Sequence, residues 1–146
     1  MTTPASFKGH PFHPMLVPLP IGLWIFSLIS DLIFKLGWGG PVWTEVAFYT
    51  MAGGTIGALL AALPGFVDFL SLTDPKTKST ALLHMILNLL AVVVFAVNLW
   101  LRMHRVPGAA LPIWLSVLGI ILISLSGWLG GELVYRHRVG VEELPG

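Results

Sequence analysis

The chain has 146 residues, of which 55% are hydrophobic and only 10% are charged, and its formal net charge is +1 at pH 7. A soluble domain carries about 25% charged residues, so most of this surface must face something other than water. The small net charge excludes a nucleic-acid binder, and the absence of cysteine excludes disulfides, zinc fingers and thiolate-held iron–sulfur clusters. The composition therefore predicts an all-α integral membrane protein in contact with the lipid bilayer.

Four long uncharged segments predict four transmembrane helices. Each interval between charges is long enough for the roughly 20 apolar residues that cross a bilayer core. The intervals run from Lys8 to Asp31, Glu45 to Asp68, Lys78 to Arg102 and Arg105 to Glu132. We place the helices near residues 14–36, 42–71, 79–102 and 110–135, in one domain that spans residues 1–146. Short connections predict an antiparallel up-down four-helix bundle with both termini on one side.

The helix ends have recognisable signals. In the first helix, Pro14 suits the first helical position and His13 the cap position, which would hold His13 at the mouth of the bundle. Before the third helix, Pro75 is expected to break the chain, and Thr77 or Ser79 to cap the helix.

Small residues at a spacing of four predict close helix packing. They are Gly53, Gly57, Ala61 and Gly65 in the second helix, and Gly127 and Gly131 in the fourth. Such stripes let helix backbones approach closely in lipid. We interpret both as packing inside the bundle; a homodimer seam and room for a flat cofactor are the alternatives.

Ionisable residues gather at one membrane face, which we call side A because the termini lie there. The predicted topology places these residues at side A: His10, His13, Asp68, His84, Glu132 and His137. Ionisable groups at membrane depth are costly and point to a functional site. The charges at the opposite face, side B, are interpreted as ordinary interfacial groups: Lys35, Glu45, Arg102, His104 and Arg105.

Two polar residues lie near these groups as candidate supports. Asn88 follows His84 by one turn on the same face of the third helix. Asp31 lies deeper, toward side B, and we expect it to accept hydrogen bonds across helices or to pair with Lys35 one turn on.

Three segments carry a resemblance to a known family. They read GHPFHPMLVPLPIGLW at 9–24, PGFVDF at 64–69 and GGELVYRHRVGV at 130–141. The chain resembles small bacterial integral membrane proteins of domain of unknown function family 2231. Another branch of that family has a histidine where this chain has Pro18. Some relatives are linked to Rieske iron–sulfur proteins, so the resemblance implies a bacterial inner membrane and a Rieske-type or other redox partner.

Three functions are consistent with the side A residues. The first is electron transfer through one b-type haem, with His84 opposite His13 or His10 as axial ligands, His137 as a further candidate and Arg136 or Arg138 at the propionates. The second is a divalent transition metal held by His13 and His84 with Asp68 and Glu132. The third is a cofactor-free proton-coupled carrier or assembly subunit. No hydrolase, phosphate-loop or dinucleotide motif assigns an enzyme activity.

The basic residues favour one orientation. Side A carries more of them than side B: Lys8, Lys76, Lys78, Arg136 and Arg138, against Lys35, Arg102 and Arg105. The positive-inside rule therefore predicts that both termini are cytoplasmic.

Overall fold

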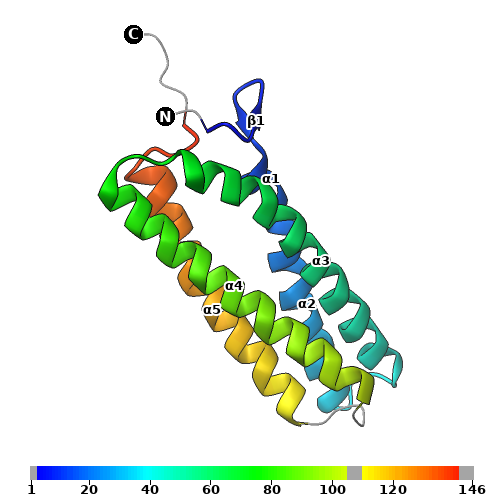
Figure 1. Ribbon diagram of the computed structural model, residues 1–146. Helices are drawn as coiled ribbons and strands as arrows, with labels where there is room; N and C mark the ends of the chain where they lie inside the picture. The colour runs from blue at the N-terminus through cyan, green and yellow to red at the C-terminus, as the bar shows by residue number, and fades with distance from the viewer. Residues whose placement is uncertain (1–2, 105–109, 142–146) are drawn as a thin grey trace.

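The computed structural model describes residues 3–104 and 110–141 (Figure 1). A short antiparallel hairpin of β1 and β2 precedes the helices, and it lies at the same end of the molecule as the C-terminal end of α5. The elements are β1 (Ser6–Phe7), β2 (His10–Pro11), α1 (Phe12–Leu16), α2 (Pro18–Lys35), α3 (Val42–Ser71), α4 (Pro75–His104) and α5 (Ala110–Tyr135). Arg105 lies outside the described residues.

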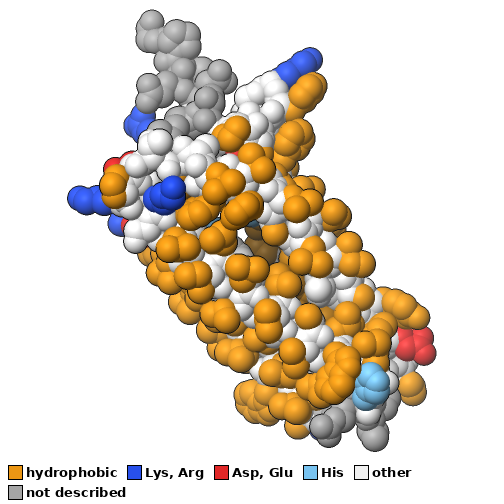
Figure 2. Space-filling model, viewed as in Figure 1, with side chains coloured by type: hydrophobic (Ala, Val, Ile, Leu, Met, Phe, Trp, Pro, Cys, Tyr) orange, Lys and Arg blue, Asp and Glu red, His pale blue; other side chains and the backbone are white. Residues whose placement is uncertain are grey.

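Four helical segments are long and apolar enough to cross a membrane, and α1 and α2 together form the first of them. They cover Phe12–Lys35, Val42–Ser71, Pro75–His104 and Ala110–Tyr135. Hydrophobic side chains cover the flanks of the bundle, and the charged ones lie at its two ends (Figure 2). The predicted antiparallel four-helix membrane fold is confirmed.

The first span begins two residues earlier than predicted, because a proline is tolerated in the first turn of a helix. Helix α1 starts at Phe12, so His13 lies inside it, and Pro11 takes the cap position that we expected for His13. First-turn N–H groups have no intrahelical partner, so Pro14 removes no ladder hydrogen bond. The chain stays nearly continuous at Val17, whose amide donates to the His13 carbonyl at 3.1 Å.

Helix α4 also begins earlier than predicted, because Asp74 caps it. Its carboxylate accepts hydrogen bonds from the Thr77 amide at 2.8 Å and the Thr77 hydroxyl at 2.7 Å. Pro75 is the first helical residue, where its fixed φ angle and missing N–H suit the helix. The expectation that Pro75 breaks the chain and that Thr77 or Ser79 caps the helix is therefore wrong.

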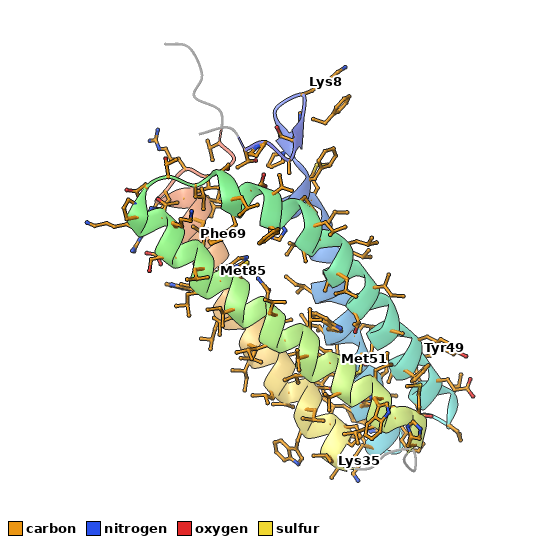
Figure 3. The ribbon with its side chains drawn as sticks, in the orientation of Figure 1. Lys8, Lys35, Tyr49, Met51, Phe69 and Met85 are labelled. Carbon is orange, nitrogen blue, oxygen red and sulfur yellow. The ribbon has the colours of Figure 1, made fainter. Side chains whose placement is uncertain are left out.

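The four spans form two pairs. Helix α2 packs along α3, and α4 packs along α5; the two pairs contact each other less extensively. At mid-bundle, the Trp24 indole stacks on the Phe95 ring with the ring centres 4.1 Å apart. Met51 is fully buried in this core, whereas Tyr49 points outward from α3 (Figure 3). The aromatic stack thus joins the pairs between the polar groups at either end.

Some glycines leave the space that a packed aromatic ring occupies, whereas others contact no described side chain of the bundle. A Cβ atom at Gly119 would lie 2.5 Å from the Phe95 ring, and one at Gly54 would lie 2.7 Å from the Trp24 indole. A Cβ atom at Gly57, which belongs to the predicted second-helix stripe, would lie 3.4 Å from the Leu19 side chain. Gly127 and Gly131 have open space beside them, so the interpretation of this stripe as packing inside the bundle is wrong. A homodimer seam there stays a prediction.

We expect Gly119→Ala to destabilise the bundle by about 1–3 kcal/mol, because the added methyl group would overpack the Phe95 ring. Gly127→Ala is the matched control on the same helix, and it should be neutral or stabilising by up to about 1 kcal/mol through helix propensity. Thermal unfolding in detergent measures both. Equal melting temperatures for the two variants would contradict the packing of Phe95 on Gly119.

The Asp74 cap predicts a pH dependence at acid pH. Hydrogen bonds from the Thr77 amide and then its hydroxyl hold the pKa of Asp74 below its ordinary value of 3.8. A depressed pKa stabilises the folded state above the ordinary value, and this stabilisation is lost as the pH falls through the folded-state pKa. Asp74→Ala should therefore lower the melting temperature at pH 7, and the difference should shrink below pH 3.8.

Asp74→Asn separates capping from charge, because asparagine caps as well as aspartate without ionising. It should melt close to the unsubstituted protein at pH 7. A difference between Asp74→Ala and the unsubstituted protein that stays constant into the acid range would argue against the ionised cap.

Candidate functional site

Two of the predicted histidines lie together inside the bundle. His13 comes from α1 and His84 from α4, so each helix pair supplies one imidazole. Their ring centres are 6.0 Å apart and the ring planes are perpendicular. Both side chains are half-buried. The structure thus brings together residues separated by most of two spans in the sequence.

A backbone carbonyl fixes each imidazole. His13 Nδ1 lies 2.8 Å from the Ala61 carbonyl oxygen of α3, and His84 Nδ1 lies 2.8 Å from the Ser126 carbonyl oxygen of α5. A carbonyl oxygen can only accept, so Nδ1 carries the proton in both neutral rings and donates it. The remaining nitrogen, Nε2, is therefore the one with a lone pair in each ring.

A glycine one turn after each carbonyl makes room for the ring. A Cβ atom at Gly65 would lie 2.7 Å from His13 Nδ1, and one at Gly130 would lie 3.1 Å from His84 Cε1. Gly65 follows Ala61 by four residues, as Gly130 follows Ser126. The two helix pairs thus hold their histidines by the same local pattern.

A proline adds to the first of these sites. Pro64 lies inside α3, where it removes one ladder hydrogen bond and bends the helix. The Ala61 carbonyl, which accepts the His13 hydrogen bond, lies in the helical turn that ends at Pro64. A local irregularity in α3 therefore coincides with the side-chain hydrogen bond.

The two Nε2 atoms differ in their surroundings. His84 Nε2 accepts a hydrogen bond from the Asn88 side-chain amide at 3.0 Å, and the same amide nitrogen donates to the His84 carbonyl at 3.0 Å. Within the described residues, His13 Nε2 has no hydrogen-bond partner. Asn88 thus contacts His84 directly, and one acceptor of the histidine pair remains unused.

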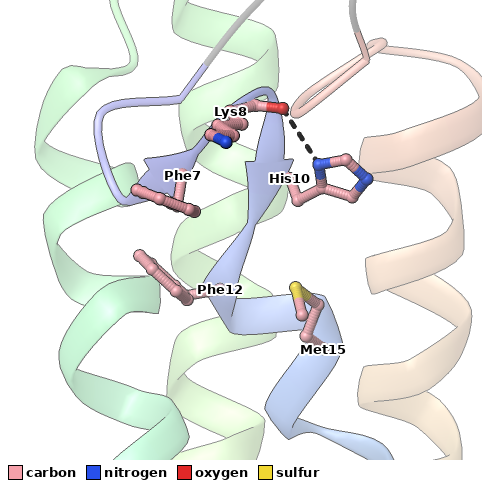
Figure 4. Close-up of a pocket in the computed structure, with 5 residues that line it drawn as sticks. All are labelled: Phe7, Lys8, His10, Phe12 and Met15. Atoms are coloured by element: carbon pink, nitrogen blue, oxygen red, sulfur yellow. Dashed lines mark hydrogen bonds between the residues drawn. The ribbon is translucent and has the colours of Figure 1, made fainter.

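The other predicted histidines lie apart from this pair. His10 is exposed in the hairpin, and its Nδ1 donates to the Lys8 carbonyl at 2.9 Å (Figure 4). His137 Nδ1 lies 2.9 Å from the Thr77 hydroxyl. His10 is therefore bound within its own hairpin, and His137 is bound to the first turn of α4.

The predicted carboxylates also have partners of their own. Asp68 accepts a hydrogen bond from the Ala5 amide at 2.9 Å and so ties the N-terminal segment to α3. Glu132 pairs with Arg136 at 2.6 Å, one turn along the chain. In the described parts of the chain, no three His, Asp or Glu side chains are grouped to hold a metal ion. The four-ligand combination of His13, His84, Asp68 and Glu132 is therefore not assembled.

One charge at side B, Arg102, was misjudged from the sequence. Arg102 forms a bidentate ion pair with Asp31 across the helix pairs, at 2.8 and 2.5 Å, and the two side chains are only 11% and 7% exposed. Arg102 is therefore no ordinary interfacial charge. Of the two roles expected for Asp31, the structure has the interhelical one, and Lys35 is not its partner.

Buried polar groups complete this ion pair. Arg102 Nε donates to the Asn98 side-chain oxygen at 3.1 Å, and the Asn98 amide donates to the Ser116 hydroxyl at 2.9 Å and to the Pro112 carbonyl at 2.8 Å. Asn98 and Ser116 are fully buried. The sequence signal that was missed is the i, i+4 spacing of two polar residues, Asn98 and Arg102, in an apolar helix.

Comparison with known proteins agrees with this architecture. The model of one family, described as predicted membrane protein (DUF2231), matches residues 9–143. The chain belongs to this family. No curated protein and no solved structure matches it. This family membership and the four apolar spans identify an integral membrane protein.

Breaking the Asp31–Arg102 pair should be costly, because it leaves one charge buried without a partner. We expect Arg102→Met to destabilise the protein by about 3–5 kcal/mol. The double variant Asp31→Leu, Arg102→Met should recover much of that loss, since it removes both charges. Unfolding in detergent measures each variant.

Arg136→Met is the control, because the Arg136 side chain is 76% exposed. An exposed pair contributes about 0–1 kcal/mol. A double variant at Asp31 and Arg102 as unstable as the sum of the two single ones would show that the charges do not depend on each other.

Proposed function

We propose that this protein binds one haem b between His13 and His84 and carries single electrons at the side A half of the membrane. The observation that carries the proposal is the pair itself: two imidazoles from different helix pairs, 6.0 Å apart between ring centres, each with Nδ1 hydrogen-bonded to a carbonyl.

The separation of the rings suits one shared metal atom. A metal–imidazole bond is about 2 Å long, so two such bonds plus the two ring radii give roughly 6 Å between ring centres. The observed 6.0 Å agrees with this sum. The proposal requires side-chain rotations that direct both Nε2 atoms at one ion.

The donor set favours haem over a bare metal ion. A transition metal without a porphyrin takes three or four protein ligands, and the described residues offer no such group. Haem iron has four ligands from its own ring and needs at most two from the protein. Two histidines without a third ligand therefore match haem better than zinc, manganese or non-haem iron.

The hydrogen bonds at Nδ1 are those that a metal-binding histidine needs. Such ligands donate their other N–H to a carbonyl or carboxylate, which fixes the ring and raises its basicity. Ala61 and Ser126 supply these carbonyls. When His84 Nε2 takes a ligand, the Asn88 amide keeps its second hydrogen bond, to the His84 carbonyl.

The apolar flank of the bundle has a hollow that is consistent with a flat bound group. Figure 2 shows a hollow between α3 and α4 in the apolar flank of the bundle. Arg136 and Arg138 stay the proposed partners of the propionates; Arg136 would have to exchange its pairing with Glu132. With both axial positions taken by protein, the group would supply one-electron transfer, which fits a Rieske-type or other redox partner at side A.

The test is a visible absorption spectrum of the detergent-purified protein, as isolated and after titration with haemin, with and without dithionite. We expect one haem per chain and the sharp reduced bands of a six-coordinate, low-spin haem. His13→Ala and His84→Ala should each lose the low-spin bands and most of the bound haem. Both variants should remain folded, because each leaves the Trp24–Phe95 stack and the Asp31–Arg102 ion pair in place.

His104→Ala is the matched control. His104 is an exposed histidine at the other end of α4, where it bonds to the Trp100 carbonyl and contacts the Trp100 ring. Its loss should leave the spectrum unchanged. Absence of low-spin haem in the unsubstituted protein, or equal spectra for all three variants, would overturn the proposal. Retention of a bare metal by elemental analysis would instead support the second function considered from the sequence.

A further inference from the structure

We propose that the β1–β2 hairpin is a binding site for an anionic phospholipid of the surrounding bilayer. A pocket of about 310 Å³ lies on its surface, lined by Phe7, Lys8, His10, Phe12 and Met15. This inference is independent of the haem proposal, because it concerns residues outside the histidine pair.

The hairpin lies at the depth of the lipid headgroups. Its second strand ends at Pro11, and the first membrane span begins at the next residue, Phe12. The hairpin extends beyond the end of the bundle above α1, with Lys8 at its tip (Figure 3). Its surroundings are therefore the boundary between headgroups and acyl chains.

The apolar wall of the pocket faces outward. Phe7, Phe12 and Met15 are 63%, 44% and 61% exposed. Figure 4 shows the two phenylalanine rings on one side of the hairpin and Met15 lower, on the other side of the chain beneath His10. The described residues leave the exposed parts of these side chains uncovered, whereas an acyl chain in the adjacent bilayer can cover them.

Lys8 supplies the positive charge. Its backbone conformation is unfavourable for lysine, which indicates that the charge has a role at this position. Lys8 and Gly9 form the two-residue turn, and both have positive φ angles, +49° and +79°. Glycine or asparagine suits such a turn better than lysine. The Lys8 ammonium lies 5.7 Å from the centre of the Phe7 ring, at the border of the apolar wall. This pairing of a cation with apolar rings is complementary to a phosphate attached to acyl chains.

The test compares lipids that share acyl chains and differ in headgroup charge. The full-length protein is purified in detergent and titrated with phosphatidylglycerol or phosphatidylcholine, and retained lipid is counted by native mass spectrometry. We expect phosphatidylglycerol to be retained more, by about the five-fold that one lysine contributes at an anionic membrane surface. Lys8→Gly should abolish this preference and leave the melting temperature equal or higher, because glycine relieves the positive φ angle.

Lys78→Gln is the matched control. Lys78 is another exposed lysine at side A, and it lies 5.6 Å from the centre of the Phe69 ring; its loss should leave the preference unchanged. Lys8→Arg should retain the preference. Equal retention of both lipids, or the same loss in Lys8→Gly and Lys78→Gln, would overturn the proposal.

Two further outcomes identify a different occupant. Displacement of the lipid by millimolar glycerol phosphate would mean that only the anion is bound and that the apolar wall has no role. A change in oligomeric state in Phe7→Ser would mean that a second copy of the chain covers the wall. Either result would overturn lipid binding at the hairpin.

Discussion

The hydrogen-bond donors inside this bundle must find their partners within the chain, because hydrocarbon offers none. The helices satisfy their own backbones, and the hydroxyl groups of several spans bond back to carbonyls, as Ser30 does to Phe26 at 2.8 Å and Thr55 to Met51 at 2.9 Å. Ser27 reaches across to the Ala47 carbonyl at 2.7 Å and so joins α2 to α3. The imidazoles obey the same requirement, and because a carbonyl can only accept, meeting it also decides which nitrogen carries the proton. In this way a folding constraint leaves a lone pair on each ring.

The two ends of the bundle meet this constraint differently. At side B, an ion pair with two charged hydrogen bonds joins α2 to α4, and at mid-bundle the Trp24–Phe95 stack continues the junction. Toward side A, the pairs meet through the buried apolar cluster of Leu72, Ala81 and Leu133 and through the approach of His13 to His84. Within the described residues, no hydrogen bond joins the two rings. The buried ion pair is therefore at the end opposite the histidines.

The fold was largely predictable from the sequence, because span length and charge spacing are set by bilayer thickness and not by details of packing. The second and fourth helices were placed at their observed bounds, 42–71 and 110–135. The start of α4 was missed because Thr77 and Ser79 are also good caps, and only the contact with Thr77 shows that Asp74 is used. For the site, topology was enough to bring His13 and His84 to one membrane face. It did not separate them from Asp68 or Glu132, because a shared depth does not fix the direction of a side chain around its helix. The Asp31–Arg102 pair was missed for the same reason. Both residues were identified in the sequence, but the sequence does not give the direction in which each side chain points from its helix.

Unused hydrogen-bonding capacity distinguishes the histidine pair toward side A from the Asp31–Arg102 network at side B. The Arg102 guanidinium donates to Asp31, Asn98 and Ser116, and each of these side chains is itself buried or bound. Any rearrangement of this network would break a hydrogen bond between buried groups, so the network is suited to holding the helices in register. The histidine pair retains an acceptor at His13 Nε2 with no partner among the described residues, and Asn88 occupies the other Nε2 through an amide that also bonds elsewhere. A group that offered coordination to both nitrogens would therefore displace one replaceable hydrogen bond and no ion pair. Binding at the histidines would therefore break fewer hydrogen bonds than binding at the ion pair, which is why we propose a function for the histidines and a structural role for the charges.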